Sequence, residues 1–211
     1  MDEHPLFARF LRYSAELGER KGAAEHRRTL LQGLRGRVLE VGAGSGVTFR
    51  HYPAGVDEVV AVEPEPTLRA AAQEAARDAP VPVHVVDGVA DDLPVGSGSV
   101  DAVVVSAVLC SVPDQARARA ELRRVLRAGG ELRFYEHVAA RRLAGDLLQR
   151  AAGATFWPRM FGGCDPHRDT EAAIRAAGFE VVALRRFTWA AGPWDVIVGP
   201  KVLGVARAPG A

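Results

Sequence analysis

The sequence predicts an α/β protein with a seven-stranded, mostly parallel sheet, helices on both faces and an antiparallel hairpin at one edge. Short apolar runs without polar alternation are typical of strands that are buried on both faces. The first five runs are separated by helical or turn-rich segments, as in successive βαβ units. The expected strands cover residues 37–41, 59–63, 81–86, 102–106, 131–138, 181–188 and 195–205.

Helices are predicted where apolar residues recur three and four positions apart. The segments are 66–78, 115–127, 141–152 and 169–177, the last with Asp169 as N-cap and Gly178 as its stop. The last two strands have no long helix between them, so we expect them to pair antiparallel at an edge. Two apolar stripes near the N-terminus predict a helical cap over residues 1–35 on a single domain at 36–211.

The composition favours a soluble, cytoplasmic protein. A formal net charge of +1 over 211 residues gives no field that would attract nucleic acid or anionic lipid. Two cysteines cannot supply a disulfide framework, which indicates a reducing compartment. The N-terminus shows neither a signal-peptide core nor the roughly 20 apolar residues that a membrane span needs. We expect a monomer or homodimer with no nucleic-acid partner and no membrane span.

The strongest local motif is VLEVGAGSG at residues 38–46, a buried strand that runs directly into a glycine-rich turn. Glycines allow a sharp turn and let backbone N–H groups approach a ligand. A dinucleotide fingerprint would have its third glycine one residue later, where Val47 stands. Glu40 within the strand suits a cationic ligand better than a pyrophosphate, although it could also be a paired buried carboxylate.

A second carboxylate, Glu63, lies seventeen residues after Gly46 at the end of the next expected strand. A carboxylate there can accept hydrogen bonds from both hydroxyls of a ribose, as in dinucleotide folds. The alternative is a solvated loop acid. Together with Glu40 and the glycine turn, Glu63 favours a nucleoside ligand that carries positive charge.

These motifs resemble those of the class I S-adenosylmethionine-dependent methyltransferases, which have a Rossmann-like fold. The resemblance continues through GVADDLP (88–94), SVDAVV (99–104) and RVLRAGG (124–130). The resemblance covers residues 36–138 and is to the subset related to ubiquinone and menaquinone methyltransferases. Val89 departs from the family, which commonly has Asp there facing the adenine; Asp87, Asp91 or the backbone would substitute. The resemblance implies that S-adenosylmethionine binds at Glu40, Gly42, Ala43, Gly44, Gly46, Glu63, Pro64, Gly88, Val89, Ala90, Ser106, Ala107 and Val108.

A closer resemblance continues through VLCSV (108–112), EHVAA (136–140) and WPRMFGGCDPHRDT (157–170). These segments are similar to the methyltransferase-like seven group, membrane-anchored enzymes that methylate thiols. The hydrophobic anchor of that group is missing here, so a soluble relative is expected. The resemblance implies a small-molecule acceptor, with a thiol as one candidate and a quinone-like or phenolic metabolite methylated on C or O as another.

His137 is the candidate general base, and Glu136 beside it is the second candidate catalytic residue. An imidazole titrates near neutrality, but a ring that only packs against the backbone is the favoured alternative. Cys110 is expected to be a buried, inert thiol. Cys164, Asp165 and His167 do not easily supply a zinc site, so no metal is expected. An NAD-dependent oxidoreductase and a non-catalytic cofactor-binding module are the competing functions.

Overall fold

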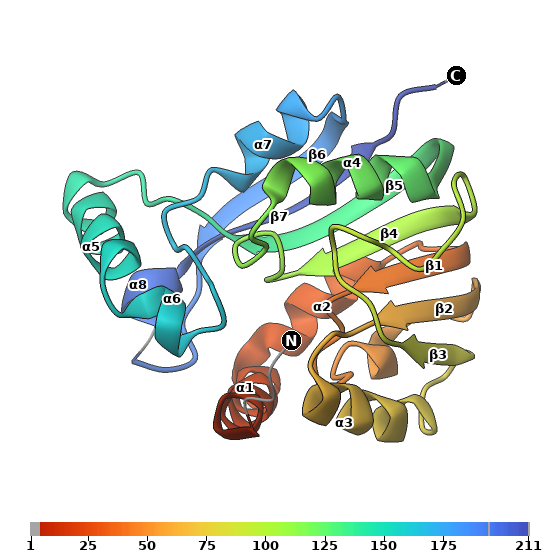
Figure 1. Ribbon diagram of the computed structural model, residues 1–211, viewed down its shortest axis with the longest axis horizontal. Helices are drawn as coiled ribbons and strands as arrows, with labels where there is room; N and C mark the ends of the chain where they lie inside the picture. Colours follow the sequence, from red (N-terminus) through yellow and green to blue (C-terminus); the bar gives the residue numbers. More distant parts are fainter. Residues whose placement is uncertain (1–4, 194, 211) are drawn as a thin grey trace.

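The computed structural model describes residues 5–193 and 195–210, and it contains one seven-stranded sheet (Figure 1). The strand order is β3-β2-β1-β4-β5-β7-β6, in which β7 runs antiparallel to both of its neighbours and the remaining pairs are parallel. The predicted fold class is confirmed. The strands are β1 (Gly36–Val41), β2 (Val56–Val62), β3 (Val83–Val86), β4 (Val100–Ser106), β5 (Leu126–His137), β6 (Glu180–Thr188) and β7 (Pro200–Arg207).

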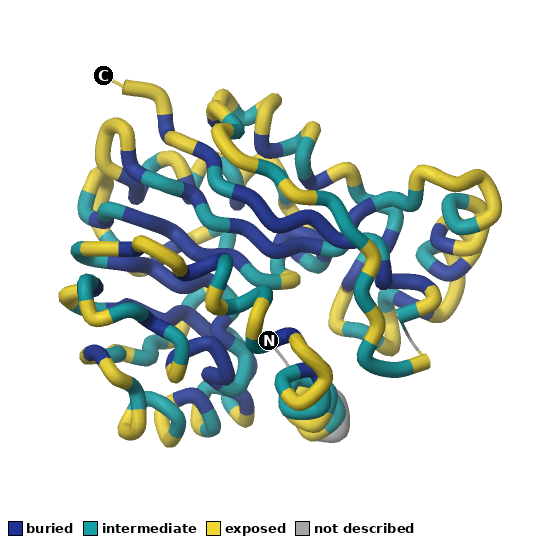
Figure 2. Tube along the Cα trace, turned by 180° about the vertical axis from the view of Figure 1, so that it is seen from behind, coloured by how far each residue is buried: buried dark blue, intermediate teal, exposed yellow. Residues whose placement is uncertain are grey.

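The central strands are buried on both faces, because successive side chains point into two different apolar clusters. In β1, Leu39 and Val41 pack into the cluster that holds Leu122 and Ile174, whereas Val38 packs into the cluster that holds Leu30. Each of these residues is at most 3% exposed. The strands are therefore dark along most of their length in Figure 2, and the sheet forms a rigid support for the loops at its ends.

Helices cover the two faces and extend beyond the carboxyl ends of the strands (Figure 1). α4 and α7 pack on one face, whereas α2 and α3 pack on the other. α5, α6 and α8 lie together past the ends of β4 and β5. Within the described residues, no helix combines the length and the apolar character needed to cross a bilayer. The helices are α1 (Pro5–Gly18), η1 (Glu19–Ala23), α2 (Ala24–Leu31), η2 (Phe49–His51), α3 (Pro66–Ala76), α4 (Gln115–Val125), α5 (Leu143–Ala154), α6 (Trp157–Met160), α7 (Thr170–Ala176) and α8 (Asp195–Val198).

Two segments differ from the sequence prediction. The strand expected over 195–205 is divided into α8 and β7, and the Asp195 carboxylate orders the turn before α8 by accepting hydrogen bonds from the N–H groups of Ala191 and Gly192 at 2.8 Å. β5 begins at Leu126, five residues before the strand expected over 131–138. Helices before residue 32 are confirmed, with a kink at Gly22 (φ +108°), while the division into a cap and a domain at residue 36 stays a prediction.

Candidate functional site

The predicted binding residues lie at or just after the carboxyl ends of the four adjacent strands β3, β2, β1 and β4, with Glu40 inside β1 and Ser106 as the last residue of β4. The order of the strands reverses between β1 and β4, which is where open α/β sheets bind ligands. Gly42 has φ +69°, and a Cβ placed on it would lie 2.5 Å from Cγ2 of Val108. Only glycine therefore allows the turn after β1 to approach the loop after β4 this closely.

Glu63, at the end of β2, is 5% exposed and holds the glycine turn in place. Its Oε2 accepts a hydrogen bond from the backbone N–H of Gly44 at 2.8 Å, and its Oε1 accepts one from Glu65 N–H at 3.0 Å. Burial raises the pKa of Glu63, and these two donors partly oppose that shift. Because a carboxylate oxygen accepts more than one hydrogen bond, Glu63 can hold the turn and still bind two hydroxyl groups.

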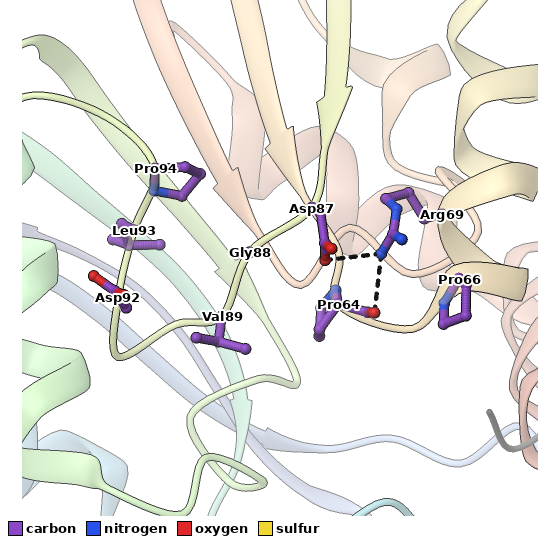
Figure 3. A pocket seen from close by; sticks show the side chains of 9 residues that line it. All are labelled: Pro64, Pro66, Arg69, Asp87, Gly88, Val89, Asp92, Leu93 and Pro94. Atoms are coloured by element: carbon purple, nitrogen blue, oxygen red, sulfur yellow. Dashed lines mark hydrogen bonds and ion pairs between the residues drawn. The ribbon is translucent and has the colours of Figure 1, made fainter. Parts of the chain in front are cut away.

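A pocket of about 580 Å³ adjoins Glu63 between the loops that follow β2 and β3 (Figure 3). Arg69 joins the two loops, because one of its guanidinium nitrogens donates to the carbonyl oxygens of Glu63 and Pro64 and to Oδ1 of Asp87, each at 2.9 Å. The predicted residue Ala90 packs instead against the apolar core beneath. The pocket is lined by Pro64, Pro66, Arg69, Asp87, Gly88, Val89, Asp92, Leu93 and Pro94.

Glu40 lies inside β1 with 2% of its surface exposed. The hydroxyl of Tyr52 donates to its Oε2 at 2.8 Å. Burial raises the pKa of Glu40 to about 7, although the bond from Tyr52 favours the charged form. Glu40 is therefore a buried carboxyl group that changes charge near neutral pH. A cation beside it would favour the carboxylate.

The loop after β4 is fixed by Glu136. Its carboxylate is 0% exposed and accepts hydrogen bonds from the backbone N–H groups of Val108, Leu109 and Cys110 at 2.9, 3.2 and 3.3 Å. Ala107, just before them, has φ +56°, a conformation that costs an alanine roughly 1–2 kcal/mol. Both carboxylate oxygens of Glu136 already bind this loop, and the geometry therefore fits positioning of the backbone better than proton transfer.

His137 follows Glu136 at the end of β5 and lies between two thiols. Its Nδ1 is 3.7 Å from Sγ of Cys110 and 3.8 Å from Sγ of Cys164. Burial lowers the pKa of His137. Asp165 and His167 have other partners: the Asp165 carboxylate accepts from the backbone N–H of His167, and the ring of His167 pairs with Asp146 at 2.6 Å.

Comparison with known proteins identifies the family. Residues 39–134 match the family model described as "Methyltransferase domain". Thiol S-methyltransferase TMT1A of Homo sapiens is 34% identical over 174 residues, which cover 80% of this chain and 69% of that protein. This chain belongs to the S-adenosylmethionine-dependent methyltransferases. The solved structures confirm the class I, Rossmann-like architecture, and membership of the family confirms the methyl donor expected from the sequence.

Other relatives of the methyltransferase agree with this assignment. Thiol S-methyltransferase TMT1B of Homo sapiens is 31% identical over 185 residues, which cover 83% of this chain and 73% of that protein. A putative methyltransferase of Haloferax volcanii, solved with the Trm112 methyltransferase activator, has a TM-score of 0.73 at 19% identity and covers 99% of this chain and 100% of its own. At that identity the solved structure supports the fold alone.

The residues present at the edge fit S-adenosylmethionine. A Cβ placed on Gly44 would meet no atom within 4 Å, so this side of the glycine turn is open to a ligand. The buried Glu40 suits a cationic ligand, and Glu63 has acceptor capacity for two ribose hydroxyls. The individual contacts stay predictions. Sequence reasoning missed Tyr52 and Arg69, because their partners Glu40 and Asp87 lie 12 and 18 positions away and no local pattern links them.

Two glycines of the turn offer a matched test of this arrangement. Gly44 and Gly46 have φ +58° and +77°, so alanine at either position is strained by about 1–2 kcal/mol. At Gly46 a Cβ would also lie 2.7 Å from Cε2 of Phe49 and 2.9 Å from Cβ of Ala75. We expect Gly46→Ala to lower the free energy of unfolding by a further 1–3 kcal/mol or so, and Gly44→Ala to weaken binding of S-adenosylmethionine instead. Urea unfolding and calorimetry would measure both effects, and unchanged affinity in Gly44→Ala would contradict a ligand at this turn.

Proposed function

We propose that this methyltransferase transfers the methyl group of S-adenosylmethionine to the sulfur of a small thiol. The observation that supports this proposal is the extent of the similarity to thiol S-methyltransferases. The match to TMT1A spans 174 residues, whereas the methyltransferase domain model covers only residues 39–134. The likeness must therefore include segments outside the common domain. A continuous match over 80% of the 211 residues includes α5 and α6 wherever it begins, and these two helices lie past the end of β5 (Figure 1), where an acceptor is expected.

Methyl transfer requires little of the protein beyond binding the donor and the acceptor and aligning them. S-adenosylmethionine supplies an electrophilic methyl group on a sulfonium. A thiolate sulfur forms a bond to that carbon while the carbon–sulfonium bond breaks, which yields a thioether and S-adenosylhomocysteine. Glu63 and the turn at residues 42–46 would hold the donor, and the loop that Glu136 orders would fix the direction of approach. We propose this positioning role for Glu136 in place of the catalytic role predicted from the sequence.

The proton of an acceptor thiol must leave before or during the transfer. His137 remains the predicted base, and its position at the end of β5 supports that proposal. Its Nδ1 already faces two cysteine sulfurs, which leaves Nε2 as the nitrogen that would take the proton. A cytoplasmic location, the absence of a nucleic-acid partner and a monomeric or homodimeric state are also part of the proposal.

Matched acceptors test the proposed substrate class. We expect transfer of a radiolabelled methyl group from S-adenosylmethionine to thiophenol and to small alkyl thiols, with the thioether identified by mass spectrometry. Phenol and aniline have the same ring and differ only in the acceptor atom, so they serve as controls. Methylation of phenols or of quinol carbons with thiols left unchanged would favour the C- or O-methyltransferase alternative. Donor binding without turnover on any acceptor would indicate a non-catalytic module.

A further inference from the structure

A cluster of metal-ligating atoms lies past the carboxyl ends of β4 and β5, and it includes Nδ1 of His137, the ring nitrogen that the proposed methyl transfer does not use. Sγ of Cys110, Nδ1 of His137 and Sγ of Cys164 all lie within 4.8 Å of one another. They come from the loop after β4, the end of β5 and the loop after α6. Both thiols are buried, at 1% and 5% exposure, and neither forms a disulfide.

The spacing of these atoms matches a tetrahedral zinc site. With Zn–S near 2.3 Å and Zn–N near 2.0–2.1 Å, tetrahedral angles place ligand sulfur and nitrogen atoms about 3.6 Å apart. The distances from Nδ1 of His137 to the sulfurs of Cys110 and Cys164 are 3.7 and 3.8 Å. The nitrogen–sulfur distances therefore match such a site. The two sulfurs lie within 4.8 Å of each other, against about 3.8 Å in a tetrahedral site, so they would move together by at most about 1 Å to bind one ion.

The backbone holds these donors in place. The N–H of Asp165, next to Cys164, donates to the carbonyl oxygen of Cys110 at 2.8 Å and ties the two cysteine loops together. Glu136 accepts a hydrogen bond from the N–H of Cys110. Arg168 donates to the carbonyl oxygens on either side of that cysteine, at residues 109 and 112. A site fixed by its surroundings loses little entropy when it binds an ion.

The surroundings of the sulfurs also suit bound zinc. The indole Nε1 of Trp157 is buried and has no hydrogen-bond partner among the described residues. Trp157 packs in the same buried cluster as both cysteines. An N–H donated to a metal-bound thiolate is a typical outer contact of such sites.

The charges balance if the ion is divalent. The nearest buried cation, Lys201, is 3% exposed and pairs with Asp195 at 3.6 Å, so this pair is neutral. The wall of the cluster is apolar and includes Ala152 and Ile197. Two thiolates alone would be costly in such surroundings. Two thiolates, a neutral imidazole and Zn²⁺ add no net charge.

We propose that Cys110, His137 and Cys164 bind one zinc ion, with a water molecule as the fourth ligand. Sequence reasoning expected no metal because it weighed Cys164 with Asp165 and His167, which have other partners in the fold. The test of this site measures metal and not turnover, so it is independent of the identity of the methyl acceptor. Zinc on Nδ1 would leave the hydrogen of the neutral imidazole on Nε2, so His137 would not act as the base while zinc is bound.

The first test uses the full chain, expressed with added zinc and dialysed against metal-free buffer. Mass spectrometry of the elements should find about one zinc ion per chain, as for a site with three protein ligands. Replacement by Co²⁺ should give a sulfur-to-cobalt charge-transfer band and the intense visible bands of tetrahedral cobalt. Zinc below about 0.1 per chain with no sulfur band from cobalt would overturn the proposal. A Cys110–Cys164 disulfide in protein purified without oxidant would also overturn it.

Variants identify the ligands. We expect Cys164→Ser and His137→Gln to hold at most about a tenth of the wild-type zinc after the same dialysis. His167→Gln is the matched control, because this nearby histidine pairs with Asp146 and should leave the zinc content unchanged. Circular dichroism checks that each variant is folded, and the cobalt spectrum of the wild type decides the question if a cysteine variant fails to fold. Full zinc in Cys164→Ser together with loss in His167→Gln would assign the metal to other residues.

Discussion

Glu63→Ala should raise the dissociation constant of S-adenosylmethionine by about 5- to 150-fold, which corresponds to about 1–3 kcal/mol. The substitution removes the acceptor proposed for both ribose hydroxyls. It also leaves the backbone N–H groups of Gly44 and Glu65 without their present partner, so the glycine turn loses a support that the structure shows before any ligand binds. Isothermal titration calorimetry with S-adenosylmethionine and with S-adenosylhomocysteine would measure the change.

Glu58→Ala provides the control for Glu63→Ala on the same strand. Glu58 lies towards the other end of β2, where it pairs with Arg37 at 2.7 Å on the partly exposed surface. Loss of such a pair changes stability by at most about 1 kcal/mol and should leave ligand affinity unchanged. If Glu63→Ala also bound both ligands with wild-type affinity, Glu63 would not be part of the donor site.

The centre of the sheet is predictable from the sequence because the same residues favour a strand locally and suit burial on both faces in the fold. Runs such as 103–105, three valines in succession, are β-branched, apolar and free of alternation, which is typical of a strand that is buried on both faces. The C-terminal edge is less predictable. An antiparallel pair was expected, but β7 lies between β5 and β6, and the sequence does not show which strand of a hairpin joins the parallel sheet. Residues 195–198 form a helix that follows a turn bound by the Asp195 carboxylate, and an apolar pattern does not reveal such a contact.

The candidate site is also predictable from the sequence in one part and not in another. Glu40, Gly44 and Glu63 are predictable because each lies within a few residues of a strand end, and the topology brings those ends together. The surroundings of His137 are not predictable in this way. Cys110 follows a neighbouring strand, but Cys164 reaches the same point only because a loop 27 residues further along the chain folds back and bonds to the carbonyl of Cys110.

The affinity for S-adenosylmethionine should fall as pH decreases below about 7. Burial raises the pKa of Glu40 from the ordinary glutamate value of 4.5 to about 7 in the protein without ligand. A cationic ligand favours the carboxylate, so a proton and the ligand compete for the same group. Binding is then strongest above pH 7 and weakens by up to about tenfold for each unit below it, or about 100-fold at pH 5.

The carboxyl group of Glu40 should also affect stability. The affinity for the ligand should rise with pH, whereas the free energy of unfolding should decline. Without ligand, the folded protein retains the proton of Glu40 to a higher pH than the unfolded chain does. The free energy of unfolding therefore declines as pH rises from about 4.5 to about 7, and this contribution is constant above pH 7. Glu40→Gln should remove both effects of this residue, whereas Glu136, whose pKa burial also raises to about 7, titrates in both proteins. The difference between wild type and variant therefore isolates Glu40.

Tyr52→Phe changes the pKa of Glu40 and keeps the carboxyl group, whereas Glu40→Gln removes that group. The Tyr52 hydroxyl stabilises the carboxylate of Glu40, so its removal should raise the pKa of Glu40 further and move the loss of affinity to higher pH while the acid itself remains. Calorimetry from pH 5 to about 8.5 would follow the transition in wild type and both variants. Parallel pH profiles for wild type and Glu40→Gln would exclude Glu40 as the group that recognises the ligand's positive charge. A transition moved upward in Tyr52→Phe and absent in Glu40→Gln can arise only if the ligand and a proton compete for this carboxylate.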